Sequence, residues 1–387
     1  MSDGNPTARR NRVFRSFWMA GFEAADHRNR FGHRVDMLAG IQHDRKAAED
    51  YANLVPLGIR CARDGLRWPA VDRGGAYDLS SWLPIVKAAR QAGVQVIWTL
   101  CHYGWPDDLD VFSAAFVDRL AKLAGTACRV LRETSDEVPM FTPVNEISFL
   151  CWAACRDFMY PFAVGRDQEL KRQLVRATIA VCEAVWDVDR RARFLYPEPV
   201  VRVFPPRSRP DLADEAESYN RAQYEAWDMI AGRLEPELGG AEKYLDIVGM
   251  NYYHANQWEH TQDRLRWEDE PRDPRWVPFH RMVLEASRRY ARPLCISETG
   301  HFGAGRGRWI LEIAREVAEA CRQGACVEAV CLYPILDRYD WENPEHWHNS
   351  GLWDFRNEAG DLRRVLNADY AAALQQSQQI VAAAGLS

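Results

Sequence analysis

The sequence predicts a single α/β domain, a (β/α)8 barrel over residues 14–387, preceded by a polar tail over residues 1–13. Two observations support this prediction. Eight short apolar runs begin at intervals of 34 to 55 residues, and amphipathic segments lie between them. This alternation is typical of strand–helix units, and eight such units close a parallel barrel.

The eight predicted strands are four to eight residues long and nearly continuously apolar, as expected of strands covered on both faces. In chain order, they cover residues 17–22, 59–66, 94–100, 138–144, 193–196, 245–252, 293–296 and 327–332.

The segments between these runs have helical periodicity. In residues 43–57 the pattern ends at Gly58, a typical C-terminal cap, and residues 170–186 and 310–321 each place their apolar side chains on one face. An open, doubly wound sheet is the alternative. Such a sheet needs only about five or six strands and usually has a glycine-rich first turn, but no G-x-G-x-x-G sequence follows any of the runs.

Composition narrows the possible functions. The 49 Lys and Arg residues against 55 Asp and Glu give a net charge of −6, which disfavours a protein that binds nucleic acid through phosphates. The sequence contains no run of 18 apolar residues, so we expect no membrane-spanning helix. The polar start of the chain lacks a signal peptide's apolar region, and most of the 10 cysteines lie in apolar segments, so we expect a cytoplasmic protein with reduced thiols. The 15 Trp residues suggest a ligand with flat apolar faces, such as a sugar.

Two carboxylates stand out at the ends of predicted strands, where a (β/α)8 barrel places its active site. Glu146 follows the fourth run and Glu298 the seventh. In a barrel these strands face each other across the bore, so both side chains could reach one ligand. Paired carboxylates suit glycoside hydrolysis, with retention of configuration at a separation of about 5 Å and inversion at about 6.5–9.5 Å.

Six segments resemble motifs of clan A glycoside hydrolases, and the match extends toward glycoside hydrolase family 1, the β-glucosidase and β-galactosidase family. TPVNE (142–146) resembles the strand-four Asn-Glu motif, and SETG (297–300) resembles the strand-seven nucleophile motif. The other four are Arg63 with Trp68, LCHYGWP (100–106), VGMNYY (248–253), and YPILDRYDW (333–341) followed by Gly351 and Leu352. The resemblance covers about residues 14–370.

The resemblance implies a retaining β-glycosidase that acts on a small glycoside without a cofactor or metal. Glu146 would be the acid/base and Glu298 the nucleophile. The remaining implied residues contact the sugar or orient Glu298: His102 and Asn145 hold hydroxyl groups, Arg63 and Tyr253 orient the nucleophile, and Asp340 and Trp341 occupy the family's Glu and Trp positions. Tyr252 and Tyr253 point to opposite faces of a strand, so only one should face the bore.

Three departures from the family pattern concern recognition of the sugar. The first strand lacks the usual Gln, so Glu23 or Asp26 takes its place; Tyr333 stands for a Trp, and Asp340 for a Glu. The chain is also shorter than a typical family member. These changes leave the sugar and the formal family open while keeping the carboxylate pair.

Two other functions use the same residues. One is a transglycosylase or a biosynthetic glycosyl-transferring enzyme, and the other is a sugar-binding barrel without catalysis. We expect no metal, because Cys151 and Cys155 lack a second ligand pair with zinc-like spacing, and because His346 and His348 lie in a polar loop.

Overall fold

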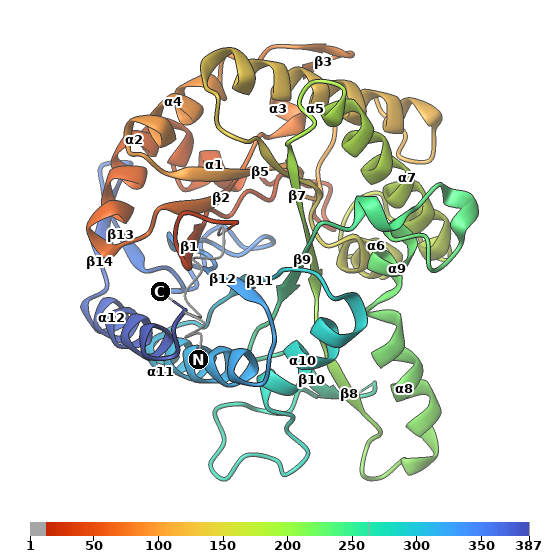
Figure 1. Ribbon diagram of the computed structural model, residues 1–387, viewed down its shortest axis with the longest axis vertical. Coiled ribbons are helices and arrows are strands. Elements are labelled where there is room, and N and C mark those ends of the chain that lie inside the picture. Colours follow the sequence, from red (N-terminus) through yellow and green to blue (C-terminus); the bar gives the residue numbers. More distant parts are fainter. Residues whose placement is uncertain (1–12, 262, 387) are drawn as a thin grey trace, which may run out of the picture.

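Eight parallel strands close into a barrel in the computed structural model, which describes residues 13–261 and 263–386 (Figure 1). This confirms the predicted (β/α)8 fold. Around the barrel the strands are β1 (Trp18–Gly21), β2 (Cys61–Gly65), β5 (Gln95–Cys101), β6 (Met140–Val144), β7 (Arg193–Pro199), β9 (Ile247–Asn251), β11 (Leu294–Thr299) and β12 (Val327–Leu332), which pairs again with β1.

The observed strands follow the predicted runs, with two informative differences. β7 and β11 continue three residues further than predicted, to Pro199 and Thr299. The added residues include Glu198 and Glu298, which break the apolar pattern although they are buried. The strand ends therefore carry polar side chains inside the fold.

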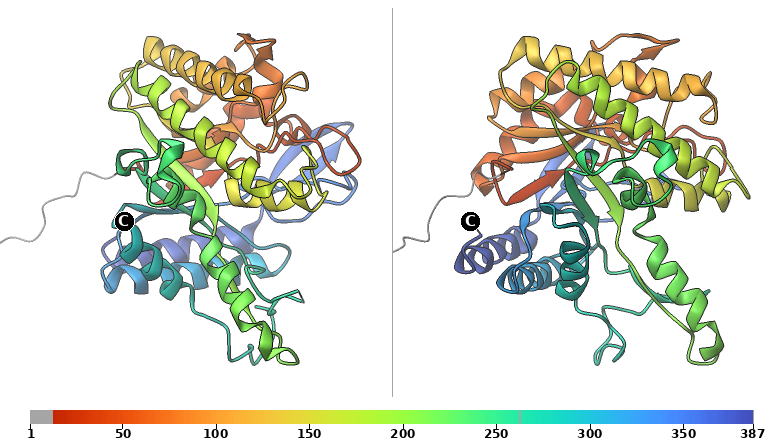
Figure 2. Two further views of the ribbon diagram at one scale, coloured as in Figure 1. Left: turned by 90° about the vertical axis from the view of Figure 1, so that its right-hand side faces the viewer. Right: turned by 45° about the vertical axis from the view of Figure 1, so that its right-hand side comes forward.

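Helices alternate with the strands and surround them (Figures 1 and 2). The longer helices are α2 (His43–Leu54), α4 (Leu83–Gln91), α5 (Ala114–Thr134), α6 (Ile147–Cys155), α7 (Asp167–Trp186), α8 (Ala213–Ala222), α10 (Phe279–Tyr290), α11 (Gly305–Arg322) and α12 (Ala368–Ala383). Short helices are α1 (Met37–Gly40), α3 (Trp68–Val71) and α9 (Glu225–Ile230). Among the described residues, no helix combines the length and apolar character needed to cross a bilayer.

Within the described part of the chain, three small sheets lie outside the barrel. β3 (Asp72–Arg73) pairs with β4 (Ala76–Tyr77), and β13 (Trp353–Glu358) forms a hairpin with β14 (Asp361–Leu366). β8 (Arg202–Phe204) pairs in parallel with β10 (Gln257–Glu259). Together with α8 and the loop before α10, this last pair projects from one side of the barrel (Figure 2).

The bore of the barrel holds an apolar layer to which all eight strands contribute. It consists of Met19, Cys61, Ile97, Met140, Leu195, Ile247, Cys295, Ala329 and Cys331, with Phe14 and Tyr333. Val13 packs against this layer, whereas residues 1–12 of the predicted tail lie outside the described residues. Such a packed bore leaves the carboxyl ends of the strands as the place for a ligand.

A buried charge cluster ties α2 to the barrel and to the C-terminal hairpin. His43 lies between Asp50 (Nδ1–Oδ2, 2.8 Å) and Asp64 (Nε2–Oδ2, 3.0 Å). Tyr51 donates a hydrogen bond to Asp64 Oδ2 (2.6 Å). Arg364 of β14 binds both oxygens of Asp50 at 2.6 and 2.8 Å. Buried ions of this kind stabilise a fold only while each one keeps its partner.

We predict that this cluster makes stability depend on pH above neutrality. Burial opposes the charge of His43, but Asp64 and Asp50 outweigh it and raise the pKa of His43 to about 9. A raised pKa contributes stability fully below about pH 6.5, and the contribution is lost as pH rises through about 9. His43→Gln should therefore lower the free energy of unfolding at pH 6 by up to about 3 kcal/mol.

Thermal melts between pH 6 and 9.5 test this prediction. The melting temperature of the wild-type chain should fall more steeply across this range than that of His43→Gln. His33→Gln, at an exposed position, is the control and should follow the wild type. Parallel curves for wild type and His43→Gln would contradict the prediction.

Candidate active site

A cavity of about 480 Å³ lies over the carboxyl ends of the barrel strands. Both predicted carboxylates line it, and so do several other residues named from the sequence. The lining includes Glu23, His102, Tyr103, Glu146, Tyr253, Glu298, Tyr333, Arg338 and Trp341, together with other polar and aromatic side chains. The closed barrel thus brings together side chains from the beginning, the middle and the end of the sequence.

Glu298 lies near the end of β11, where the pairing register with β9 and β12 shifts. Such an irregularity re-aims a side chain. Arg63 Nη1 donates a hydrogen bond to Glu298 Oε1 (2.9 Å), and the Tyr253 hydroxyl donates one to Oε2 (2.8 Å). Both oxygens of Glu298 are therefore held in place. Tyr252, the residue before Tyr253, points away from Glu298, and its ring stacks on that of Phe279 with ring centres 4.1 Å apart.

Arg63 is a buried cation beneath the cavity, with 1% of its surface exposed. Besides Glu298, its Nη1 donates to the Ser297 carbonyl oxygen (2.7 Å), and its Nη2 donates to Asn145 Oδ1 (2.7 Å). The guanidinium also lies 5.5 Å from the ring centre of Tyr333. Arg63 thus joins the ends of β2, β6 and β11 through one planar group.

Glu146 lies between β6 and α6, and its backbone has a left-handed φ of 44°. The hydroxyl of Tyr103, itself at φ 70°, donates a short hydrogen bond to Glu146 Oε2. Asn251 Nδ2 donates to Glu146 Oε1 (2.9 Å). Left-handed backbone is costly for residues with side chains and persists where the surroundings impose it. Two strained residues therefore meet at this carboxylate.

The surroundings of Glu146 favour its protonated form. Burial and the charge of Glu298 raise the pKa of Glu146 to about 8, although the hydrogen bonds from Tyr103 and Asn251 act in the opposite direction. At neutral pH this carboxyl group keeps a proton. Glu298 has a cation beside it, so the two carboxyl groups differ in environment.

Asn145 orders the hydrogen bonds between these two groups. Its Oδ1 accepts from Arg63, which leaves Nδ2 as the donor to Tyr103 (3.0 Å) and toward His102 Nε2 (3.2 Å). Burial and the charge of Arg63 lower the pKa of His102 well below its usual range. The neutral imidazole accepts at Nε2 and carries its proton on Nδ1. This Nδ1 is buried and has no hydrogen-bond partner among the described residues.

Glu23 occupies the wall formed by the first strand. Tyr333 donates to its Oε1 (3.3 Å), His102 Nε2 lies 3.8 Å away, and Arg338 Nε lies 3.6 Å from Oε2. Burial raises the pKa of Glu23 despite the charge of Arg338. Asp26, the other residue proposed for this place, does not line the cavity in the described part of the chain.

Asp340 stands apart from the other predicted site residues. Its Oδ1 accepts hydrogen bonds from the backbone of Glu342 and Asn343, and its Oδ2 lies 3.3 Å from His348 Nε2. It does not appear in the cavity lining of the described residues, whereas Trp341 and His348 do. The structure thus places the side chain of Asp340 in its own loop.

Three residues at the site were not singled out from the sequence. Tyr103 and Asn251 both lie in segments quoted for the resemblance, and their hydrogen bonds to Glu146 depend on the fold. Arg338 follows the end of β12. Glu198 accepts from the Ser148 backbone N–H (3.0 Å) at the start of α6 and is not among the described residues that line the cavity.

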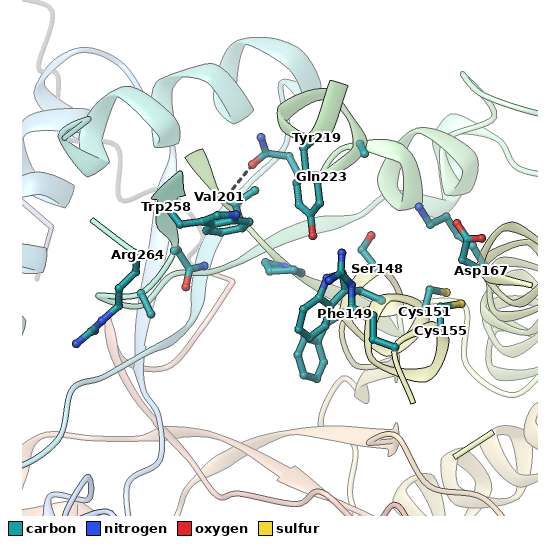
Figure 3. Close-up of a pocket in the computed structure, with 17 residues that line it drawn as sticks. Ser148, Phe149, Cys151, Cys155, Asp167, Val201, Tyr219, Gln223, Trp258 and Arg264 are labelled. Carbon is teal, nitrogen blue, oxygen red and sulfur yellow. Dashed lines mark hydrogen bonds between the residues drawn. The ribbon is translucent and has the colours of Figure 1, made fainter. Parts of the chain in front are cut away.

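A second, larger cavity of about 970 Å³ adjoins the first (Figure 3). Phe149, Pro199, Ala255 and Asn256 line both cavities. Most of the wall of the second cavity is apolar and aromatic and includes Cys151, Trp152, Cys155, Val201, Tyr219 and Trp258. Four charged residues, Arg156, Asp167, Lys171 and Arg264, also line it. A ligand at the carboxylates could therefore extend into an apolar space.

Comparison with known proteins shows the fold. No protein-family model matches the sequence, and no curated protein matches it. Among solved structures, the β-glycosidase from Pyrococcus horikoshii is similar, with 15% identity and a TM-score of 0.72 over 90% of this chain and 88% of that one. The family 1 β-glucosidase from Thermotoga maritima has 14% identity and a TM-score of 0.68 over 88% and 87%. A hyperthermophilic β-glucosidase mutant has 15% identity and a TM-score of 0.69 over 92% and 97%.

We predict that Glu298→Gln lowers the pKa of Glu146. The charge of Glu298 is one of the two main causes of the raised value, and removing a nearby like charge favours ionisation by about one pKa unit. Titration of ¹³C-labelled glutamate carboxyl groups by NMR measures this change directly.

Asp340→Asn is the matched control for this titration. Asp340 lies outside the cavity lining, so its charge should leave the pKa of Glu146 unchanged. A Glu146 pKa that stays the same in Glu298→Gln would show that the two carboxyl groups do not interact.

Proposed function

We propose that the protein is a retaining β-glycosidase that hydrolyses small β-glycosides through Glu146 and Glu298. The observation that carries this proposal is the asymmetry of the pair. Both side chains line one cavity, yet Glu298 is bound by Arg63 and Tyr253 while the pKa of Glu146 is raised to about 8. Glycoside hydrolysis needs this combination of a carboxylate and a carboxylic acid. The similarity in fold to β-glycosidases is consistent with it.

In the first step, a Glu298 oxygen forms a bond to the anomeric carbon while the bond from that carbon to the leaving oxygen breaks. Glu146 transfers its proton to the leaving oxygen, so the aglycone departs as a neutral alcohol. Arg63 and Tyr253 keep the Glu298 oxygens in position for this attack.

In the second step, water attacks the anomeric carbon and releases Glu298. Once Glu298 is esterified its charge is gone, which removes one cause of the raised pKa of Glu146. Glu146 can then accept the proton of the attacking water. Two displacements at the same carbon retain its configuration.

The sugar ring would be held by the polar wall of the first cavity. His102 lines this wall, and Glu23 offers carboxyl oxygens beside Arg338. Trp341 provides a flat apolar face, and its indole N–H has no partner among the described residues. Asn145 lies below this wall and acts by fixing His102 and Tyr103.

The adjoining apolar cavity would receive the aglycone. Phe149 and Trp152 stack there with ring centres 5.8 Å apart, and the volume suits an aromatic or aliphatic group larger than a methyl. This cavity could equally hold an acceptor alcohol, so glycosyl transfer is the second candidate function. Product analysis with an added aryl alcohol distinguishes transfer from hydrolysis.

We predict that Glu298→Ala lowers kcat on an activated aryl β-glycoside by about 10⁴-fold, or roughly 5.5 kcal/mol of transition-state stabilisation. Azide should restore turnover by attacking in place of the missing carboxylate, and the glycosyl azide should have inverted configuration.

Glu146→Ala is the informative partner variant, because azide should then yield a product of retained configuration. Glu133→Ala removes an exposed carboxylate on α5 and should keep wild-type kinetics without an azide effect. Full activity of Glu298→Ala would refute the assignment of the nucleophile. Binding of glycosides without turnover by the wild type would instead indicate a sugar-binding barrel.

We predict that Trp152→Ala raises the KM for a naphthyl β-glycoside about 10-fold relative to the wild type, since burying an aromatic face contributes on the order of 1.4 kcal/mol. The KM for the methyl glycoside of the same sugar should change little, because its aglycone does not reach Trp152. Equal changes for both substrates would show that the second cavity does not bind the aglycone.

A further inference from the structure

Two imidazoles and one carboxylate converge at the rim of the first cavity. His254 follows β9, His301 follows β11, and Glu268 lies in the loop before α10. One ligand atom from each residue lies within 4.8 Å of the other two, and the two imidazole rings are 4.1 Å apart. His254 and His301 line the cavity that contains Glu298.

Each of these residues has a buried polar atom without a hydrogen bond to any described residue. These atoms are His254 Nδ1, His301 Nε2 and Glu268 Oε2. His254 is only 8% exposed and His301 only 6%. A buried polar atom without a partner costs free energy, and three of them on residues of one cluster indicate that a ligand belongs there.

The remaining polar atoms of the cluster already have partners that set its orientation. His254 hydrogen-bonds the backbone of Gly300. His301 Nδ1 lies 2.9 Å from the Phe302 carbonyl oxygen and 2.8 Å from the Phe302 backbone nitrogen. In the tautomer in which Nδ1 donates to the carbonyl oxygen, Nε2 keeps its lone pair. Arg264 Nη2 donates to Glu268 Oε1 (3.1 Å), so Oε2 remains. Histidines that bind metals have this pattern, with the second ring nitrogen held by backbone or carboxylate.

A direct contact between His301 and Glu268 does not account for the cluster. Their closest approach is 3.4 Å, from His301 Nε2 to Glu268 Oε1, and that oxygen already accepts from Arg264. Such a contact would also leave His254 Nδ1 without a partner. Trp267 lies 5.2 Å from the His301 ring and Trp309 lies 6.2 Å from the His254 ring, and these indoles shield the cluster.

We propose that His254, His301 and Glu268 bind a divalent transition-metal ion of the zinc class at the rim of the cavity. Two imidazoles and a carboxylate form a set that Zn²⁺ prefers. Tetrahedral ligation separates ligand atoms by roughly 3.3 Å, so the side chains close around the ion by small rotations. The fourth position remains for a water molecule or a substrate oxygen. This site stands on its own geometry and does not depend on the proposed glycosidase function.

The site also differs from the expectation that the chain binds no metal. The three residues lie 14 and 33 positions apart in the sequence, and neither interval is a recognised zinc spacing. Only the barrel, by placing the ends of β9 and β11 side by side, brings the two histidines together.

Metal titration of the full chain tests the proposal. After removal of metals with EDTA, the protein is titrated with Co²⁺, followed by its visible absorption, and with Zn²⁺, followed by calorimetry. We expect one ion per chain. His254→Ala and His301→Ala should each weaken binding by about 100-fold or more, beyond the 10- to 100-fold typical of losing only a partner of a ligand. Glu268→Gln, which keeps the shape of the side chain, should also weaken binding.

His346→Ala is the matched control, because it removes an exposed imidazole from the loop near His348. It should bind both ions like the wild type. The proposal is overturned if the wild type binds neither ion, if the cluster variants bind as tightly as the wild type, or if His346→Ala is the variant that loses the ion. Circular dichroism verifies that each variant is folded, and the wild-type titration needs no variant at all.

Discussion

The arrangement of the site depends on the buried guanidinium of Arg63. A buried cation is tolerated only with well-placed partners, and Arg63 finds them in Glu298 (2.9 Å) and Asn145 (2.7 Å). Because Asn145 must present its oxygen to Arg63, its amide nitrogen faces Tyr103 and His102. The Tyr103 proton is then directed to Glu146. One cation therefore sets the direction of the hydrogen bonds that run from Arg63 through Asn145 and Tyr103 to Glu146.

The same arrangement makes two chemically identical side chains different. Glu298 is hydrogen-bonded to the cation Arg63. For Glu146, burial and the charge of Glu298 raise the pKa, and only the neutral donors Tyr103 and Asn251 act in the opposite direction. The difference is a matter of position in the barrel, and it depends on the charge of Glu298. A change in that charge would change the pKa of Glu146, and the proposed two-step displacement uses this coupling.

Around the two carboxyl groups, the segments beyond the strand ends form an aromatic cavity on one side and a cluster of possible metal ligands on another. The α6, α8 and β8–β10 side offers an aromatic cavity, and the ends of β9 and β11 offer two histidines next to Glu268. The barrel fold is similar to that of solved β-glycosidases at 14–15% identity. In (β/α)8 barrels, strand ends hold the functional groups and the loops determine which ligands reach them.

The sequence by itself determined the eight strands and most of the residues that gather at their ends, since apolar periodicity reflects burial and each strand end carries its own local motif. Even so, the predicted strands ended too early at β7 and β11, because the buried polar residues Glu198 and Glu298 break the apolar pattern on which the prediction depended. Tertiary structure alone decided the contacts of Tyr103 and Asn251 with Glu146, the position of Asp340 outside the cavity, and the meeting of His254, Glu268 and His301. These depend on distances between segments far apart in the chain, and no local pattern encodes such distances.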